Sequence, residues 1–476
     1  MNYLTPISYV GFKDPIFPPD IFSHPRDFPS VDELQVRLQQ GTVTSVALVV
    51  QAFARIEALN KKGPCLNAVI ETNPDAISVA QALDAERASG VSRGPMHGIP
   101  LLLKANIDTA DAMQTCAGSL AMVGEPAAVD AAVVSCLRDA GAIILGKANM
   151  SEWAGFRDWA IPYGWSGRAG LTRNPLSVLL TAHGSSSGSA VGVAAGFVPV
   201  AVGTETNGSI INPALFNQVV GFRPSFGLIS NAGLVPLMRG QDTPGPMARS
   251  VRDVALLLAA MQGPQASDYA AALDAAALSG TRIGYRRLQA DGTRTVDLPA
   301  FRALAQRLER AGAVLVPADL VFPDLMNDQL DVICHEFKRD LKSYLSSRTG
   351  LEVADLAQVI AFNDNHAGGD NYDQGLLRQA EALSLGEDEY SNKAGRLRQL
   401  SQSFINEALS QYELAAFMDL PGQEMGAIGA QAGYPGLIVP TGPDAQGQPT
   451  GLYLAGTGSS DQLLLSLGHA FEQTAA

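Results

Sequence analysis

The sequence is poor in basic residues. Its 476 residues include 33 Lys and Arg against 47 Asp and Glu, which gives a formal net charge of −14. A protein that binds nucleic acid needs clustered Lys and Arg to contact phosphates, and no basic run is present here. The composition therefore argues against nucleic acid as a partner.

The sequence also has few cysteines and no recognisable metal motif. Its four cysteines, Cys65, Cys116, Cys136 and Cys334, lie far apart, without a CxxC pair, a Cys–His cluster or an HExxH motif. The sequence therefore predicts no metal site, and isolated cysteines are typical of reduced, packed residues. The first 20 residues lack a basic region followed by an apolar run, so no signal peptide is expected and a cytoplasmic protein is favoured.

What is present is ample material for a large core. Hydrophobic residues make up 46% of the chain and charged residues 17%. A helical pattern, a glycine and a buried strand follow one another at 130–150 and again at 299–317. This alternation is typical of a sheet covered by helices. We therefore expect an α/β protein with one domain over 1–476, an α/β/α sandwich around a large mixed, mostly parallel sheet.

Two regions flank this expected core. Residues 1–29 are rich in Pro, Phe and Tyr without helical periodicity, and we expect an extended N-terminal arm. The pattern of residues 325–412 predicts mostly polar amphipathic helix, which is a candidate cap over the functional site. No segment of the chain looks like a membrane span, because even the longest uncharged stretch is interrupted by Gly, Ser, Thr and Pro.

That uncharged stretch, 174–204, contains the strongest sign of chemistry. HGSSSGSA (183–190) and GTETNGSIINPA (203–214) flank the apolar segment VGVAAGFVPVAV. Small-residue loops of this type expose backbone N–H groups at close range, as an oxyanion hole requires. A single such loop is more often a flexible turn. The pairing of the loops and the absence of charge favour a catalytic site.

A serine nucleophile needs a base, and the residue types alone leave the choice open. His183 is the one histidine in these loops. Lys104 follows the apolar run GIPLLL, and Lys147 follows AIILG. A lysine can act as a base where burial keeps it neutral, although a lysine at a strand end more often reaches out to solvent.

Three segments in this order, GIPLLLKANID (98–108), HGSSSGSA and GTETNGSIINPA, resemble the amidase signature family. The resemblance is strong over about 80–260 and weaker at GYPGLIVPTG (433–442). It implies an amidohydrolase that cleaves a carboxylic amide C–N bond through a Ser–cis-Ser–Lys triad and an acyl-enzyme. Ammonia or an amine would be released, and no metal or organic cofactor would be needed.

The resemblance also implies roles for individual residues. Matching the motifs makes Ser209 the nucleophile, Ser185 the relay serine and Lys104 the base. The oxyanion would be bound by the backbone N–H groups of Thr206, Asn207, Gly208 and Ser209.

The sequence departs from the family pattern at several positions. The usual T-G-G-S-I-R reads T-N-G-S-I-I, with Asn207 in place of a glycine and Ile211 in place of an arginine. Asparagine is at ease in left-handed backbone conformations, so we expect it to be tolerated. His183 replaces the first glycine of the serine loop. With these changes the chain is most similar to the peptide-amidase-like branch, with a small-molecule or peptide amide as substrate.

Two other interpretations compete. GSSSG (184–188) fits the G-x-S-x-G motif of an α/β-hydrolase-type esterase, with Ser186 as nucleophile and Asp461 and His469 as partners. The chain could also be a partner-dependent amidotransferase subunit, against which the acidic composition and the departures at Asn207 and Ile211 speak.

Four further residues are candidates for substrate binding: Ser186, Trp153, Asp242 and Phe362. Asp108 could orient Lys104, but an Asp after a strand is more often a turn residue. We expect a monomer or homodimer. The sequence does not specify the acyl and amine parts of the substrate.

Overall fold

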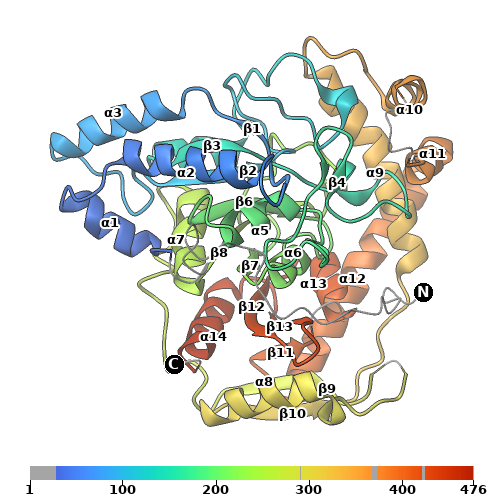
Figure 1. Ribbon diagram of the computed structural model, residues 1–476. Coiled ribbons are helices and arrows are strands. Elements are labelled where there is room, and N and C mark those ends of the chain that lie inside the picture. Colours follow the sequence, from blue (N-terminus) through green and yellow to red (C-terminus); the bar gives the residue numbers. More distant parts are fainter. Residues whose placement is uncertain (1–27, 290, 367–371, 421–423, 475–476) are drawn as a thin grey trace.

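The computed structural model describes residues 28–289, 291–366, 372–420 and 424–474. Its centre is an 11-stranded sheet in the order β1-β3-β2-β6-β8-β7-β12-β13-β11-β9-β10 (Figure 1). The strands are β1 (Val69–Thr72), β2 (Pro100–Lys104), β3 (Ile143–Ala148), β6 (Val200–Glu205), β7 (Val220–Arg223), β8 (Thr243–Ala248), β9 (Arg282–Arg286), β10 (Val314–Ala318), β11 (Ala416–Asp419), β12 (Gly436–Pro443) and β13 (Pro449–Ala455). Two short strands, β4 (Trp165–Ser166) and β5 (Gly170–Leu171), pair separately.

The expected large mixed sheet is confirmed, but parallel strands do not dominate it. Four of the ten neighbouring pairs are parallel, namely β2–β3, β2–β6, β9–β10 and β9–β11, and six are antiparallel. One reason is visible at β12 and β13, which are joined by a tight turn closed by a bond from Asp444 N–H to the Gln448 carbonyl (2.8 Å). A connection this short can join only antiparallel strands.

Helices cover both faces of the sheet. Successive side chains of a strand point to opposite faces, so apolar residues on both faces need a covering layer. Leu101 and Leu103 belong to one hydrophobic cluster and Leu102 to another. The first cluster includes side chains from α1 (Val31–Gln39), α4 (Ala132–Asp139), α7 (Val251–Gln262), α8 (Pro299–Arg310) and α14 (Asp461–Gln473). The second includes α2 (Ser45–Leu59), α3 (Ala76–Ala88), α5 (Ser187–Ala194), α6 (Ile211–Phe216), α12 (Glu387–Gln411) and α13 (Glu424–Ala432).

The region expected to be helical, 325–412, does form helices, which lie along one side of the molecule in Figure 1. They are α9 (Met326–Ser346), α10 (Leu356–Asn365), α11 (Gly375–Ala382) and α12. A third hydrophobic cluster joins α9, α10 and α11 to residues that follow β2 and β3, among them Ala105 and Met150. The helices therefore pack at the end of the sheet where Lys104 and Lys147 lie.

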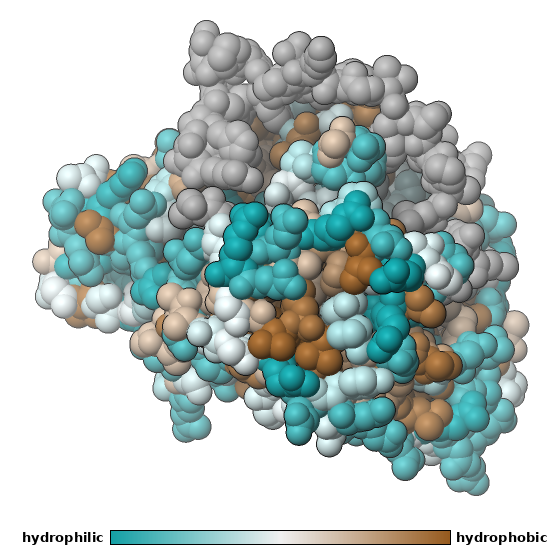
Figure 2. Space-filling model, turned by 90° about the horizontal axis from the view of Figure 1, so that it is seen from below, coloured by the Kyte–Doolittle hydropathy of each residue, from teal (hydrophilic) through white to brown (hydrophobic). Residues whose placement is uncertain are grey.

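On the face seen in Figure 2, the described residues form no extended apolar area. Seen from below, the side on which α8, β9 and β10 lie in Figure 1 is largely hydrophilic, with apolar residues in small groups (Figure 2). None of the helices in the described part of the chain is long and apolar enough to cross a membrane. The expected arm, 1–29, lies outside the described residues except for Phe28 and Pro29.

Candidate active site

Lys104 ends strand β2 and is fully buried. Its Nζ donates hydrogen bonds to Ser185 Oγ (2.7 Å) and to the Thr204 carbonyl (2.9 Å). Burial disfavours the charged ammonium and lowers the pKa of Lys104 to about 7, although the negative charges of Asp242 and Glu205 oppose that shift. A substantial fraction of this lysine is therefore neutral near pH 7, with its nitrogen against a serine hydroxyl.

The loop that carries Ser185 is held from two sides. The Gly184–Ser185 peptide bond is cis. The Ser185 carbonyl accepts from Ser151 N–H (3.1 Å), and Ser186 N–H donates to the Ser209 carbonyl (3.1 Å). The two Ser/Gly loops, separate in sequence, thus meet through a backbone hydrogen bond next to the two serines.

Ser209 follows β6 in a bend that leads into α6. Gly208 has φ +73°, in the left-handed region that glycine favours. The buried Glu205 carboxylate accepts from the N–H groups of Ile210 (2.7 Å) and Ile211 (3.1 Å), which fixes the chain just after Ser209. The N–H groups of Asn207, Gly208 and Ser209 have no hydrogen-bond acceptor among the described residues.

The segment before Ser209 is anchored by Thr206. Its hydroxyl donates to Asp242 Oδ1 (2.6 Å), and its carbonyl accepts from Gln241 Nε2 (2.5 Å). Asp242 also accepts from Leu237 N–H and Met238 N–H, and burial raises the pKa of its carboxyl to about 6. Asp242, a substrate-binding candidate, therefore has its carboxylate oxygens engaged by the protein itself.

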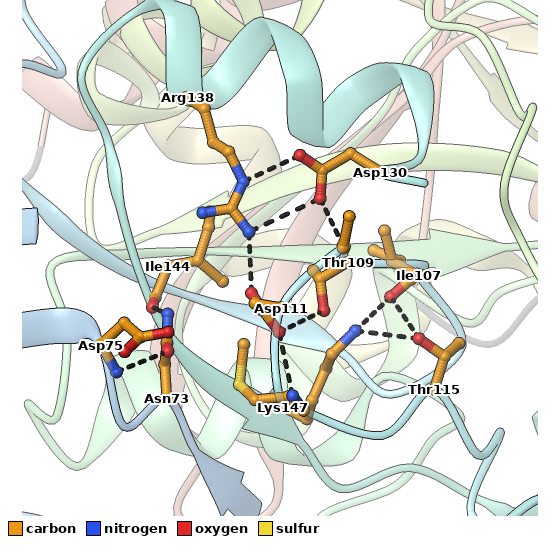
Figure 3. Close-up of polar contacts among 12 residues, drawn as sticks. Asn73, Asp75, Ile107, Thr109, Asp111, Thr115, Asp130, Arg138, Ile144 and Lys147 are labelled. Carbon is orange, nitrogen blue, oxygen red and sulfur yellow. Dashed lines mark hydrogen bonds and ion pairs between the residues drawn. The ribbon is translucent and has the colours of Figure 1, made fainter. Parts of the chain in front are cut away.

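Lys147, on β3, is fully buried and belongs to a separate set of polar contacts (Figure 3). Its Nζ donates to the Ile107 carbonyl and to Thr115 Oγ1 (3.1 Å), and burial lowers its pKa to about 8. Asp108 does not orient Lys104; it accepts from Tyr344 OH (2.7 Å) and pairs with Arg348 (3.3 Å). Of the two lysines, Lys104 is the one that contacts a serine of the loops.

His183 is not placed as a general base for the serines. Its Nδ1 accepts from Gly184 N–H (2.9 Å), and its ring stacks on Tyr163 at 4.3 Å and lies 4.8 Å from Phe216. Burial lowers the pKa of His183 to about 4, so it is neutral but weakly basic. The sequence did not indicate these aromatic partners.

The structure does not bring the α/β-hydrolase candidates together. Ser186 Oγ donates to the Thr204 carbonyl (3.0 Å) and accepts from Thr204 N–H (3.2 Å). Asp461 accepts from the N–H and hydroxyl of Ser225 (2.8 and 2.5 Å), and His469 lies on α14. Ser186 and Asp461 thus have other partners, and His469 Nδ1 has no hydrogen-bond partner among the described residues.

The aromatic candidates belong to the third hydrophobic cluster. Trp153 is buried and packs edge-on against Phe337 of α9, with ring centroids 5.8 Å apart. Phe362 is half-buried and stacks on His366 at 4.0 Å. Both side chains lie where the helical region meets the loops after the strands, without a hydrogen-bonded link to the serines among the described residues.

Two departures from the family motif have simple structural settings. Asn207, which we expected the loop to tolerate, has a negative φ and an exposed side chain, so the loop accepts it without a left-handed conformation. Ile211 is buried in the second hydrophobic cluster.

Several supporting residues escaped the sequence analysis. Arg223 is fully buried and donates to the Glu205 carbonyl and the Gln241 carbonyl (both 2.8 Å). Gln241 and Ser151 hold the backbone at Thr206 and Ser185. Glu205 could have been noticed as the first charge after the uncharged stretch 174–204. In the described residues, no group of three or more His, Cys, Asp or Glu could hold a metal ion.

Comparisons with known proteins show which family this chain is similar to. A family model described as "Amidase" matches residues 47–420. A protein of Arabidopsis thaliana named "Probable amidase" is 37% identical over 472 residues, covering 93% of this chain and 89% of that protein. One component of the glutamyl-tRNA(Gln) amidotransferase of Azoarcus sp. is 34% identical, covering 93% and 97%. The crystal structure of native peptide amidase from Stenotrophomonas maltophilia superposes with a TM-score of 0.89 at 40% identity, covering 95% and 98%.

Proposed function

This chain belongs to the amidase signature family and is an enzyme that hydrolyses amide bonds, and we propose that Ser209, Ser185 and Lys104 are its nucleophile, relay and base. The observation that carries the proposal is the 2.7 Å contact between Lys104 Nζ and Ser185 Oγ. This contact joins a buried lysine of lowered pKa to the serine loop. That loop is in turn hydrogen-bonded to the Ser209 carbonyl through Ser186 N–H.

The proposed reaction begins with two proton transfers. Neutral Lys104 accepts the Ser185 hydroxyl proton while Ser185 accepts the Ser209 hydroxyl proton, and Ser209 Oγ bonds to the amide carbonyl carbon. The resulting oxyanion is bound by backbone N–H groups of Thr206, Asn207, Gly208 and Ser209. One such donor typically contributes about 3 kcal/mol to transition-state stabilisation.

The second half of the reaction reverses the proton path. The protonated Lys104 returns a proton through Ser185 to the amine, and the C–N bond breaks to leave an acyl group on Ser209. Water then donates its proton through Ser185 to Lys104 as its oxygen attacks the acyl carbon. The bond between the acyl carbon and Ser209 Oγ then breaks, and protonated Lys104 returns the proton through Ser185 to Ser209 Oγ. The acid is released, with no cofactor in any step.

For the substrate we propose a peptide amide. The support is the 40% identity with the peptide amidase of Stenotrophomonas maltophilia over nearly the whole chain. A panel of aryl, alkyl and peptide C-terminal amides, scored by release of ammonia or amine, tests this. The peptide amide should be hydrolysed fastest, and turnover of aryl amides alone would contradict the proposal.

The nucleophile is tested by Ser209→Ala. We expect activity to fall by at least about 10³-fold, because the triad works as one unit, while circular dichroism and melting temperature stay unchanged. Ser186→Ala is the matched comparison. Activity within tenfold of wild type in Ser209→Ala, with loss in Ser186→Ala, would move the nucleophile to Ser186.

The amidotransferase relatives supply a second test. As an independent amidase the purified chain should be active alone. If ammonia release required a second protein, the chain would instead be a partner-dependent subunit.

We further propose that the chain folds as a single domain in the cytoplasm. Support for one domain comes from the sheet, which takes strands from Val69 to Ala455, and support for a reducing compartment comes from four unpaired cysteines. Calorimetry should give one unfolding transition. Release of a folded half by proteolysis near residue 265 would contradict the single domain.

A further inference from the structure

Resting on the proposed oxyanion loop, we infer that Glu336 and Arg398 of the helical region are positioning residues for the reaction. They hold the backbone of Gly240 from both sides, and through Gly240 they fix the peptide between Thr206 and Asn207. Neither side chain would contact the substrate.

Gly240 is held between two helices. Glu336, on α9, accepts from Gly240 N–H through Oε2 (3.0 Å), and Arg398, on α12, donates through Nη2 to the Gly240 carbonyl (2.5 Å). Glu336 is 2% exposed and also accepts from Tyr390 OH (2.9 Å). The Arg398 guanidinium lies over the Phe226 ring at 4.7 Å. The Glu336 carboxylate and the Arg398 guanidinium are therefore each held by a further contact besides their bond to Gly240.

The absence of a side chain at Gly240 permits this approach. A Cβ built there would lie 3.2 Å from Glu336 Oε1, closer than ordinary van der Waals contact. A side chain at this position would require the Glu336 carboxylate to move away by a few tenths of an ångström.

The residues after Gly240 transmit this restraint to the active site. Gln241 Nε2 donates to the Thr206 carbonyl (2.5 Å), and Asp242 Oδ1 accepts from the Thr206 hydroxyl (2.6 Å). The carbonyl and the hydroxyl of Thr206 are therefore both hydrogen-bonded to side chains of the two residues that follow Gly240. A shift of Gly240 would therefore act on both anchors, which are also held by Arg223 at the Gln241 carbonyl and by backbone N–H groups at Asp242.

Peptide geometry carries the restraint to the proposed oxyanion site. The Thr206 carbonyl and the Asn207 N–H belong to one planar trans peptide and point in opposite directions. A bond that fixes the carbonyl therefore also fixes the direction of the N–H. Because an oxyanion donor must meet the developing charge at about 2.7–3.1 Å, a small rotation of this peptide weakens transition-state binding.

Glu336 is not the one acidic residue of α9 that ties this helix to α12. Asp328, also on α9, pairs with Lys393 (3.5 Å) and Arg396 (2.8 Å) of α12, with no hydrogen bond to the 237–242 loop among the described residues. Asp328 therefore ties the same two helices together without contacting Gly240. It is the matched control for a role in packing alone.

The test uses the full chain and the amide substrate that it hydrolyses best. Glu336→Ala should lower kcat about tenfold with KM within twofold, because oxyanion binding is gained mainly in the transition state. Glu336→Gln should restore kcat to within threefold, since its amide can accept from Gly240 N–H and donate to the Tyr390 oxygen. Arg398→Met, which removes the other bond to Gly240, should show the same split between kcat and KM.

The control separates this role from simple destabilisation. Asp328→Ala should lower the melting temperature at least as much as Glu336→Ala does, with kcat within twofold of wild type. Equal losses of kcat in the two alanine variants, or wild-type kcat in Glu336→Ala, would overturn the inference while Ser209→Ala still tests the triad. Failure of Ser209→Ala to abolish activity would instead overturn the proposed function.

Discussion

The surroundings of Lys104 and Lys147 differ in what the two lysines contact, although their settings in the sheet are alike. The lysines lie at the same end of the neighbouring parallel strands β2 and β3, with Lys104 opposite Ala148. Both are fully buried, and burial lowers their pKa values to about 7 and about 8. Burial therefore makes either lysine available as a base at mildly alkaline pH.

The partners distinguish the two sites. Lys104 Nζ contacts Ser185, whose loop is bonded to Ser209. Lys147 Nζ contacts the Ile107 carbonyl and the Thr115 hydroxyl, and that hydroxyl donates back to the same carbonyl (3.3 Å). Lowered basicity is therefore not sufficient for catalysis, because a base must also meet a proton that the reaction releases.

The largest effect expected from this difference is in turnover. Lys104→Met should lower kcat at least about 10³-fold, since the proton from Ser185 would have no acceptor. Lys147→Met should leave kcat within about threefold, because its partners lie outside the proposed relay. Steady-state kinetics on one peptide amide checks both. Comparable losses in the two variants would show that the difference in contacts has no catalytic meaning.

The relay serine gives the next effect. Ser185→Ala should lower kcat by about 10³-fold, and adding Lys104→Met should cost little more, because the two residues act as one unit. The matched double variant of Ser185 and Lys147 should show the Ser185 loss alone. Multiplicative losses in the Lys104 double variant would mean that lysine and serine act independently.

The sequence predicted the elements better than the contacts. The helix–glycine–strand patterns at 130–150 and 299–317 form α4 with β3 and α8 with β10 in the structure. Strand β2 and the buried Lys104 agree with the apolar run before it. Local patterns of this kind depend on neighbouring residues, which the sequence displays directly.

The sequence did not reveal hydrogen bonds between residues that lie far apart along the chain. Arg223 and Gln241 contact Thr206 from 17 and 35 residues away along the chain, and Glu336 contacts Gly240 from 96 residues away. No motif marks these residues. The share of parallel strands was overestimated for the same reason, because pairing of distant strands does not follow from their local pattern. The choice between Lys104 and Lys147 likewise needed the family resemblance.

The pH dependence of turnover gives a smaller effect with a defined sign. The base must be neutral, and the neutral fraction of Lys104 grows as pH rises through its pKa of about 7. We expect kcat/KM to rise about tenfold between pH 6 and pH 8 and then to level off. Lys147→Met and His183→Ala should keep this profile. Loss of the rise in His183→Ala would assign it to the histidine.

The smallest effect concerns stability, and it treats the two lysines alike. Each has a folded pKa below its ordinary value of 10.5, so between the two values the unfolded chain binds a proton that the folded chain does not. Stability therefore rises with pH, by at most about 1.4 kcal/mol per pH unit for each lysine, above about pH 8 for Lys147 and above about pH 7 for Lys104. Below those values the cost of burying the charged lysine is fully present.

Urea unfolding at pH 7 to 9.5 should show a shallower rise for Lys147→Met and for Lys104→Met than for wild type, because each variant has lost one titrating group. Titration of tyrosine and cysteine is common to all three proteins and cancels in the difference. Slopes identical to that of wild type would show that the pKa values of the two lysines are not lowered in the folded chain, and the resemblance between the two sites would then be lost.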